Sequence, residues 1–347
     1  MLFNIWVTTA CNMRCKYCYE NSTDIKKMNL FLDIKTAEKM VDFVIEYMQK
    51  RDKKEYLIVN FHGGEPLLNF SIIKDIERMI RENFDNKRIL FGITTNALLL
   101  ENNEIIKFLA DNFEYSLSIS IDGTKKNHDF NRVDSNQKGT YDRVEMYLKQ
   151  LLTMNAKVRA RMTITPETID CMEESIDHLY NLGLRTIVPV LDVFNQGWTQ
   201  ENFDSYTHQL VNLKNKYGEY KDVSIGPLKE IDNRQLNGEC NPLDEAINIC
   251  SDGLIYPCTY SVGMEDFVIG SVFEGLYIKK IDKILAHNKE KNSVCSGCNN
   301  YKFCKGTRCK IINKILMGDY NTPPPVWCCI ENSHIRAERS FKCNTQN

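Results

Sequence analysis

Six apolar segments with strand character alternate with amphipathic helical segments over the first 191 residues, and this alternation limits the possible folds more than any other feature. The expected strands span residues 3–8, 56–61, 88–94, 115–121, 157–163 and 185–191. Helical connections between successive strands allow parallel pairing through right-handed crossovers. The pattern therefore predicts an α/β protein with a parallel sheet. Periodicity does not distinguish an open doubly wound sheet from an incomplete barrel.

Composition argues against several classes of partner. The 347 residues include 44 basic and 46 acidic side chains, so no basic surplus is available for a phosphate backbone or an anionic bilayer. No apolar run approaches the ~18 residues of a membrane span, and the N-terminal residues lack the pattern of a signal peptide. We therefore expect a cytoplasmic protein without nucleic-acid or membrane partners. In a reducing cytosol, its 14 cysteines indicate metal binding rather than disulfides.

A first cysteine group, Cys11, Cys15 and Cys18, directly follows the first predicted strand with the spacing Cys-x3-Cys-x2-Cys. Three thiolates on one short loop can bind three irons of a [4Fe–4S] cluster. The fourth iron would then be open to an exogenous ligand. The alternative is a structural zinc site with a distant fourth ligand.

This loop resembles the signature of the radical S-adenosylmethionine (SAM) superfamily, Cys-x3-Cys-x-aromatic-Cys, with Tyr17 as the aromatic residue. The resemblance continues at the ends of later strands, through His62-Gly63-Gly64-Glu65-Pro66, Thr94-Thr95-Asn96, Ser118-Ile119-Ser120-Ile121-Asp122-Gly123 and Arg132. It implies a TIM-like partial (β/α)6 barrel over residues 1–225. It also implies a SAM-binding [4Fe–4S] cluster on Cys11, Cys15 and Cys18.

The same resemblance implies SAM-binding roles for residues in these motifs. Gly63 and Gly64 would let backbone carbonyls approach the SAM ammonium, and Glu65 would add a compensating charge. Ser120 and Arg132 would bind the ribose and the carboxylate. Tyr17 and Asn96 complete the expected cofactor-binding set.

Residues 226–347 form a cysteine-rich region with hairpin and loop character, and its spacings resemble the SPASM domain. This resemblance implies two auxiliary [4Fe–4S] clusters, a nearer one on Cys240, Cys258 and Cys309 and an outer one on Cys295, Cys298, Cys304 and Cys328. The four residues between Cys304 and Cys309 exceed the family spacing by one. Cys250 as a further ligand and Cys329 in place of Cys328 remain open, and a zinc ribbon is the alternative.

The resemblance implies reductive cleavage of SAM to a 5′-deoxyadenosyl radical, which removes hydrogen from a peptide residue. Two auxiliary clusters favour net oxidation, and we expect an oxidoreductase of the peptide-maturase type that forms a thioether or carbon–carbon crosslink. Sulfatase-maturing enzymes instead oxidise a Cys or Ser side chain to formylglycine, which is the alternative reaction. Their catalytic Asp follows the cysteine that corresponds to Cys258, where this chain has Thr259.

A non-catalytic iron–sulfur or zinc protein is a third possibility, but it would not need the SAM-binding motifs. Expected partners are a peptide or protein substrate and a flavodoxin- or ferredoxin-type electron donor. Because the first barrel strand is expected at about residue 3, no leader-binding module precedes it. Recognition of a leader peptide would then need a separate leader-peptide recognition protein or another surface of this chain.

Overall fold

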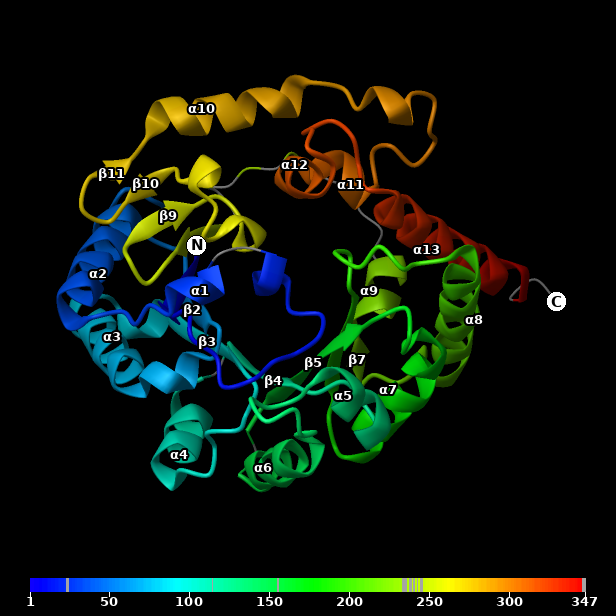
Figure 1. Cartoon of the computed structure of the whole chain (residues 1–347), viewed down its shortest axis with the longest axis horizontal. Coiled ribbons are helices and arrows are strands. Elements are labelled where there is room, and N and C mark those ends of the chain that lie inside the picture. The colour runs from blue at the N-terminus through cyan, green and yellow to red at the C-terminus, as the bar shows by residue number, and fades with distance from the viewer. Residues whose placement is uncertain are drawn as a thin grey trace.

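The computed structural model describes residues 1–22, 25–113, 115–154, 156–232, 236, 239, 241, 243 and 246–344. Its strands form one sheet in the order β11-β10-β9-β8-β1-β2-β3-β4-β5-β6-β7. Viewed as in Figure 1, the strands curve around the centre and helices lie outside them.

The predicted strands are all present and pair in parallel in sequence order. They are β1 (Leu2–Thr8), β2 (Leu57–Gly63), β3 (Ile89–Thr95), β4 (Ser116–Ser120), β5 (Val158–Ile164) and β6 (Thr186–Leu191), followed by a short β7 (Ser224–Ile225). In a doubly wound sheet the strand order would reverse at a switch point. Sequential neighbours therefore identify a partial barrel, which confirms the predicted fold class.

Long helices cover the outer face of the barrel: α2 (Ile34–Gln49), α3 (Phe70–Asn83), α4 (Asn103–Asn112), α6 (Tyr141–Thr153), α7 (Met172–Asn181) and α8 (Gln200–Tyr217). Asp33 caps α2, because its Oδ1 accepts hydrogen bonds from Lys35 N (2.9 Å) and Thr36 N (3.1 Å). Helix α7 begins directly after a separate 3₁₀ turn formed by residues 169–171. Shorter helices are α1 (Ile25–Met28), α5 (Lys125–Asn131) and α9 (Gly226–Asp232).

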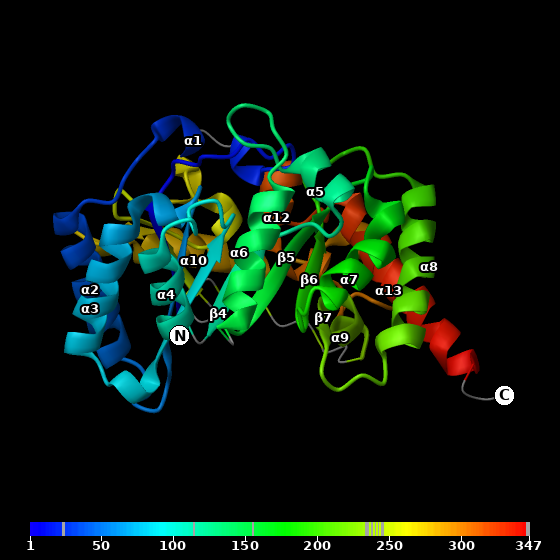
Figure 2. The same ribbon diagram turned by 90° about the horizontal axis from the view of Figure 1, so that it is seen from below.

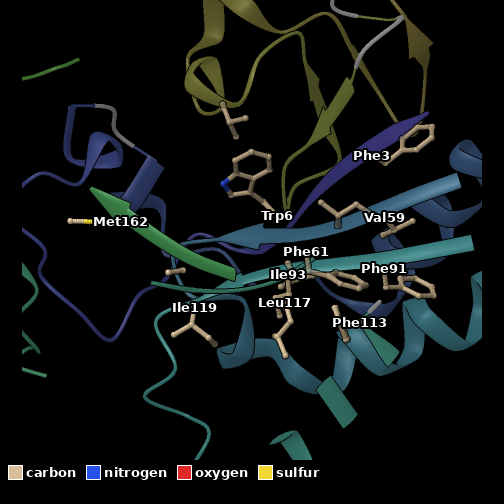
Figure 3. Close-up of a cluster of buried hydrophobic side chains, with 14 of the residues drawn as sticks. Phe3, Trp6, Val59, Phe61, Phe91, Ile93, Phe113, Leu117, Ile119 and Met162 are labelled. Atoms are coloured by element: carbon tan, nitrogen blue, oxygen red, sulfur yellow. The ribbon is translucent and has the colours of Figure 1, made fainter. Parts of the chain in front are cut away.

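The main core lies between the sheet and these helices (Figure 3). Phe61 and Phe91 on adjacent strands stack with ring centroids 6.1 Å apart, and Phe113 packs 6.0 Å from Phe61. The opposite face of the sheet carries polar residues: Asn60 Nδ2 donates to Asn4 Oδ1 at 2.9 Å, and Ser116 and Ser118 share a hydrogen bond. A TIM-barrel interior is usually packed with branched apolar side chains. A polar interior indicates a ligand cavity.

The C-terminal region continues the barrel sheet. Strand β8 (Ala246–Ile249) pairs in parallel with β1, and β9 (Leu254–Tyr256), β10 (Gly270–Ser271) and β11 (Gly275–Leu276) add antiparallel strands. Its buried side chains belong to the same hydrophobic cluster as those of the barrel. The cysteine-rich region therefore shares the core of the barrel. A domain boundary near residue 225 remains a prediction.

Helices α10 (Ile278–Ala286), α11 (Lys305–Arg308) and α12 (Lys310–Met317) lead across the open side of the ring to α13 (Pro325–Asn344). Figures 1 and 2 both place α13 beside α8. Arg336 pairs there with Asp204 at 2.7 Å, and Tyr206 shares a buried 3.0 Å hydrogen bond with His334. The chain thus closes on itself through its last helix. No helix in the described part is long and apolar enough to cross a membrane.

Candidate SAM and iron–sulfur site

A cavity of about 410 Å³ occupies the barrel and extends to the loops at the carboxyl ends of its strands. Its lining includes every residue that the radical SAM resemblance selects for the first site: Cys11, Cys15, Cys18, Tyr17, Gly63, Gly64, Glu65, Asn96, Ser120 and Arg132. The fold thus brings these dispersed motifs together. Their individual roles stay predictions.

The cysteine loop is held from two sides by backbone hydrogen bonds. On one side, Gly64 N donates to Thr8 O (3.2 Å) and Glu65 N to Ala10 O (2.8 Å). On the other side, residues 14 and 16 donate to the carbonyls of residues 133 and 131 at 2.8 and 3.0 Å. The three thiols are partly exposed. This clamping fixes the loop that would present them to a cluster.

The two glycines allow the cysteine loop to approach β2 closely. A Cβ on Gly63 would lie 2.2 Å from Thr8 O, and one on Gly64 would lie 2.3 Å from Ala10 O. Gly63 also has φ +143°, which disfavours a side chain. The family resemblance explains these glycines by contact with SAM. The structure shows that they also allow close packing of the cysteine loop against β2, which cannot be inferred without the fold.

Glu65 is buried and joins the second and third motifs. Its carboxylate accepts hydrogen bonds from Thr95 Oγ1 (2.7 Å), Asn96 N (2.7 Å) and Leu67 N (3.1 Å). Burial raises the pKa of Glu65 to about 7, although these hydrogen bonds oppose the rise. Asn96 Nδ2 in turn donates to Asn12 Oδ1 at 2.7 Å, inside the cysteine loop. Glu65 therefore holds the site together, besides any contact with SAM.

Arg132 forms a buried cluster with two other side chains. Its Nε donates to Asp122 Oδ2 at 3.0 Å, and the guanidinium carbon lies 5.2 Å from the centroid of the Tyr17 ring. Tyr17 also donates its hydroxyl to Asp122 Oδ2, at 2.5 Å, and Asp122 Oδ1 accepts from Thr163 N at 2.9 Å. Burial alone would lower the pKa of Arg132, but the negative charge of Asp122 raises it. Sequence reasoning selected Tyr17 and Arg132 but missed their partner Asp122.

His62 and Asp192 line the cavity as well. His62 stacks on Trp6 with centroids 4.5 Å apart, and burial lowers its pKa to about 4, so the ring is neutral. Asp192 directly follows β6, where Trp198 Nε1 donates to its carbonyl at 2.8 Å and Phe194 N donates to its Oδ1 at 3.1 Å. Burial raises the pKa of Asp192. Asp192 could have been selected from the sequence, because it directly follows a predicted strand and so lies at its carboxyl end, as the SAM motifs do.

The outer cysteines gather in the C-terminal region. Burial raises the pKa of Cys295, and the charges of Cys298 and Cys328 raise it further, as Cys295 does for Cys304. Burial raises the pKa of Cys329, and the charge of the adjacent Cys328 raises it further. The choice of Cys328 over Cys329 as a ligand stays a prediction.

For the nearer auxiliary site, Cys258 and Cys309 both lie close enough to raise the pKa of the buried Tyr260. Cys240 lies outside the described residues. Cys250 is buried, and its backbone N donates to Leu254 O at 2.9 Å. Burial raises the pKa of its thiol to about 12. Its role as a further ligand stays open. Among the described residues, no three His, Cys, Asp or Glu side chains lie close enough together to hold a single metal ion.

Comparison with known proteins agrees with this geometry. A cysteine-type anaerobic sulfatase-maturating enzyme of Clostridium novyi is 24% identical over 86% of this chain and 84% of its own length. An uncharacterized protein of Methanocaldococcus jannaschii is 31% identical over 182 residues, and the chain spans only 59% of that relative. The solved structure of native anSMEcpe with bound AdoMet and the Cp18Cys peptide aligns with TM-score 0.79 and 20% identity, over 99% of this chain and 98% of that one. This likeness shows a shared fold that includes the cysteine-rich region.

The model of the radical SAM superfamily matches residues 5–179, which is half of the chain. That range contains the cysteine loop and every motif selected for SAM. The chain therefore belongs to the radical SAM superfamily, whose members bind SAM and a [4Fe–4S] cluster.

Proposed function

We propose that this protein is a peptide maturase that cleaves SAM, removes a hydrogen atom from a peptide residue and forms an oxidative crosslink. The observation that carries the proposal is the single cavity shared by the three loop cysteines and all the predicted SAM-binding residues. In the proposal, Cys11, Cys15 and Cys18 hold the first cluster. Bound there with SAM, that cluster supplies the radical that removes hydrogen from unactivated carbon.

The remaining groups of the cavity fit the binding of SAM. The polar interior and the buried Arg132 suit a zwitterionic ligand, and Ser120 lies at the carboxyl end of β4. The fixed cysteine loop keeps the reacting groups in one geometry, which is the main contribution that the protein makes to radical chemistry.

Two auxiliary clusters on the C-terminal cysteines are part of the proposal. The outer one is supported by the electrostatic effects that link Cys295 to Cys298, Cys328 and Cys304. A crosslink requires the substrate to lose two hydrogens. One leaves as an atom to the SAM-derived radical, and the other leaves as an electron and a proton. The auxiliary clusters would supply an acceptor for that electron.

The proton requires a base. Of the carboxylates that line the cavity, Glu65 accepts hydrogen bonds that tie it to the neighbouring strand β3, whereas the Asp192 carboxylate accepts only from backbone N–H groups of its own loop. We assign the proton to the Asp192 carboxylate. Thr259 lines the same cavity but donates its hydroxyl to Asn248 Oδ1 at 3.1 Å and has no basic group.

Formylglycine formation is the second candidate, because the relationship to a sulfatase-maturating enzyme extends over most of the chain. Thr259 in place of a carboxylate argues against it. The two candidates predict different products. A crosslinked peptide loses two hydrogens and gains no aldehyde. Formylglycine made from cysteine loses two hydrogens and also exchanges sulfur for oxygen, and formylglycine made from serine loses two hydrogens but carries an aldehyde that a carbonyl reagent detects.

Anaerobically reconstituted protein should convert SAM to 5′-deoxyadenosine under reduction by a flavodoxin or a ferredoxin. Simultaneous substitution of Cys11, Cys15 and Cys18 by Ala should abolish this cleavage and remove about four irons. Cleavage by the triple variant would refute the assignment of the first cluster. Short peptides encoded beside the gene are the first substrates to test by mass spectrometry, with and without a separate leader-binding protein.

A further inference from the structure

Strand β5 carries two arginines, Arg159 and Arg161, at alternate positions. Both line the cavity, and in the sheet register they lie opposite Ser118 and Ser120 of β4. Alternate residues of a strand point to the same face, so their Cα atoms lie about 7 Å apart. Two guanidinium groups therefore face the space in which a substrate would bind.

Neither arginine is neutralised by the protein. Among the described residues, no ion pair or hydrogen bond involves the side chain of Arg159 or Arg161, whereas Arg132 pairs with Asp122 at 3.0 Å. An arginine cannot lose its proton at physiological pH. Two unpaired like charges on one strand repel each other. Arg159 is half-buried and Arg161 is exposed, so both guanidinium groups remain accessible to a ligand. A bound anion would offset the repulsion between them.

The other described groups that line the cavity do not neutralise the positive charge of Arg159 and Arg161. His62 is neutral, and Glu65 is tied to β3 by its hydrogen bonds. Asp192 is the remaining carboxylate of the cavity, and it forms no ion pair with Arg161. Serine hydroxyls on β4, opposite the arginines, add hydrogen-bond donors. This part of the wall therefore has the chemistry of a carboxylate site.

We propose that Arg159 and Arg161 form a subsite that binds a carboxylate of the peptide substrate, from an Asp or Glu side chain or a free C-terminus beside the reacting residue. This inference rests on the proposed function, because it takes the ligand to be a peptide. The carboxylate of SAM has the same chemistry and is the competing occupant. The experiment therefore measures SAM and peptide separately.

The test uses the full reconstituted protein with SAM and two probes, acetyl-Gly-Glu-Gly-amide and acetyl-Gly-Gln-Gly-amide, in anaerobic equilibrium dialysis. The Glu probe should bind at least about ten-fold more tightly than the Gln probe, as expected for a charge-assisted contact. Arg159→Gln and Arg161→Gln should each remove most of this preference while SAM affinity changes less than about two-fold, and Arg159→Lys should keep part of the preference. Arg143→Gln, on the outer surface of α6, is the matched control.

Glutarate provides a test that needs no variant, because it should displace the Glu probe from the wild-type protein without displacing SAM. Equal binding of the two probes, or no binding of either, would overturn the inference. So would Arg→Gln variants that lose SAM and keep the peptide preference, since the arginines would then belong to SAM. If the protein binds the Glu probe selectively but forms no 5′-deoxyadenosine, the proposed function fails and the anion subsite stands.

Discussion

At the scale of single residues, Arg132 has two separable tasks, because it neutralises the buried Asp122 and lines the cavity. Arg132→Ala would leave the Asp122 carboxylate buried and unpaired. We expect the free energy of unfolding to fall by about 3–5 kcal/mol. SAM affinity should fall as well, by about ten-fold or more. Anaerobic denaturant titration and equilibrium dialysis measure the two effects.

The double variant Asp122→Asn/Arg132→Gln separates these tasks. It removes both charges and retains hydrogen-bonding groups, so most of the lost stability should return while SAM affinity stays low. Recovery of SAM binding in the double variant would contradict the role assigned to Arg132. Arg143→Ala, which removes an exposed arginine, should leave both quantities unchanged.

The raised pKa of Glu65 leads us to expect that SAM binding depends on pH. Its pKa is raised to about 7, so the protonated form is favoured in the folded state. The stability that it contributes is fully present below the unfolded pKa of about 4.5 and is lost as the pH rises through about 7. A SAM ammonium beside Glu65 would favour the ionised form and release the proton on binding.

SAM affinity should therefore rise about ten-fold between pH 6 and pH 8 and level off above that range. Dialysis at several pH values measures this slope. Glu65→Gln should remove the slope, and Asp192→Asn should keep it. A wild-type affinity that does not vary with pH would show that the SAM ammonium does not lie beside Glu65.

At the scale of elements, the cysteine loop depends on the glycines that it packs against. Gly64→Ala would place a Cβ 2.3 Å from Ala10 O, and backbone atoms cannot move aside as a flexible side chain can. The loop should shift, and SAM cleavage should fall more than about ten-fold while the helical content is retained. Gly226→Ala is the control, because its nearest contact would be an ordinary 3.7 Å. Full activity of Gly64→Ala would refute the clamping of the loop.

Elements with a strong local signal were predictable from the sequence. The barrel strands and most of their helices follow from apolar periodicity, and their boundaries differ by one or two residues for the strands. The hairpin of β8 and β9 follows from short strand patterns on either side of the turn Ser251-Asp252-Gly253. No local pattern reveals that β8 pairs with β1, more than 240 positions earlier. The Asp122–Arg132 pair and the Gly64 packing were missed for the same reason. They depend on contacts that exist only after the sheet has formed.

At the scale of the whole molecule, the C-terminal region has two parts that are stabilised in different ways. Strands β8–β11 continue the barrel sheet, and Ser251 Oγ donates to Trp6 O at 2.7 Å. By contrast, no side chain from residue 293 to residue 305 is fully buried, and this segment carries Cys295, Cys298 and Cys304. A metal site can supply folding energy where apolar burial is low. The outer cluster would therefore stabilise this segment and leave the sheet independent of it.

This division predicts the result of replacing Cys295 and Cys298 together by Ser. The sheet and the first cysteine loop should stay folded, so the variant should still cleave SAM to 5′-deoxyadenosine. Crosslinked product should be lost, because the path for the substrate electron is interrupted. Limited proteolysis should cut only within residues 293–305, and Cys329→Ser should behave like the wild type. If SAM cleavage and product fell together and cuts spread into β8–β11, the cluster would instead hold the whole region. A protease-resistant variant that made full product would exclude both roles and leave Cys295 and Cys298 without a function in the reaction.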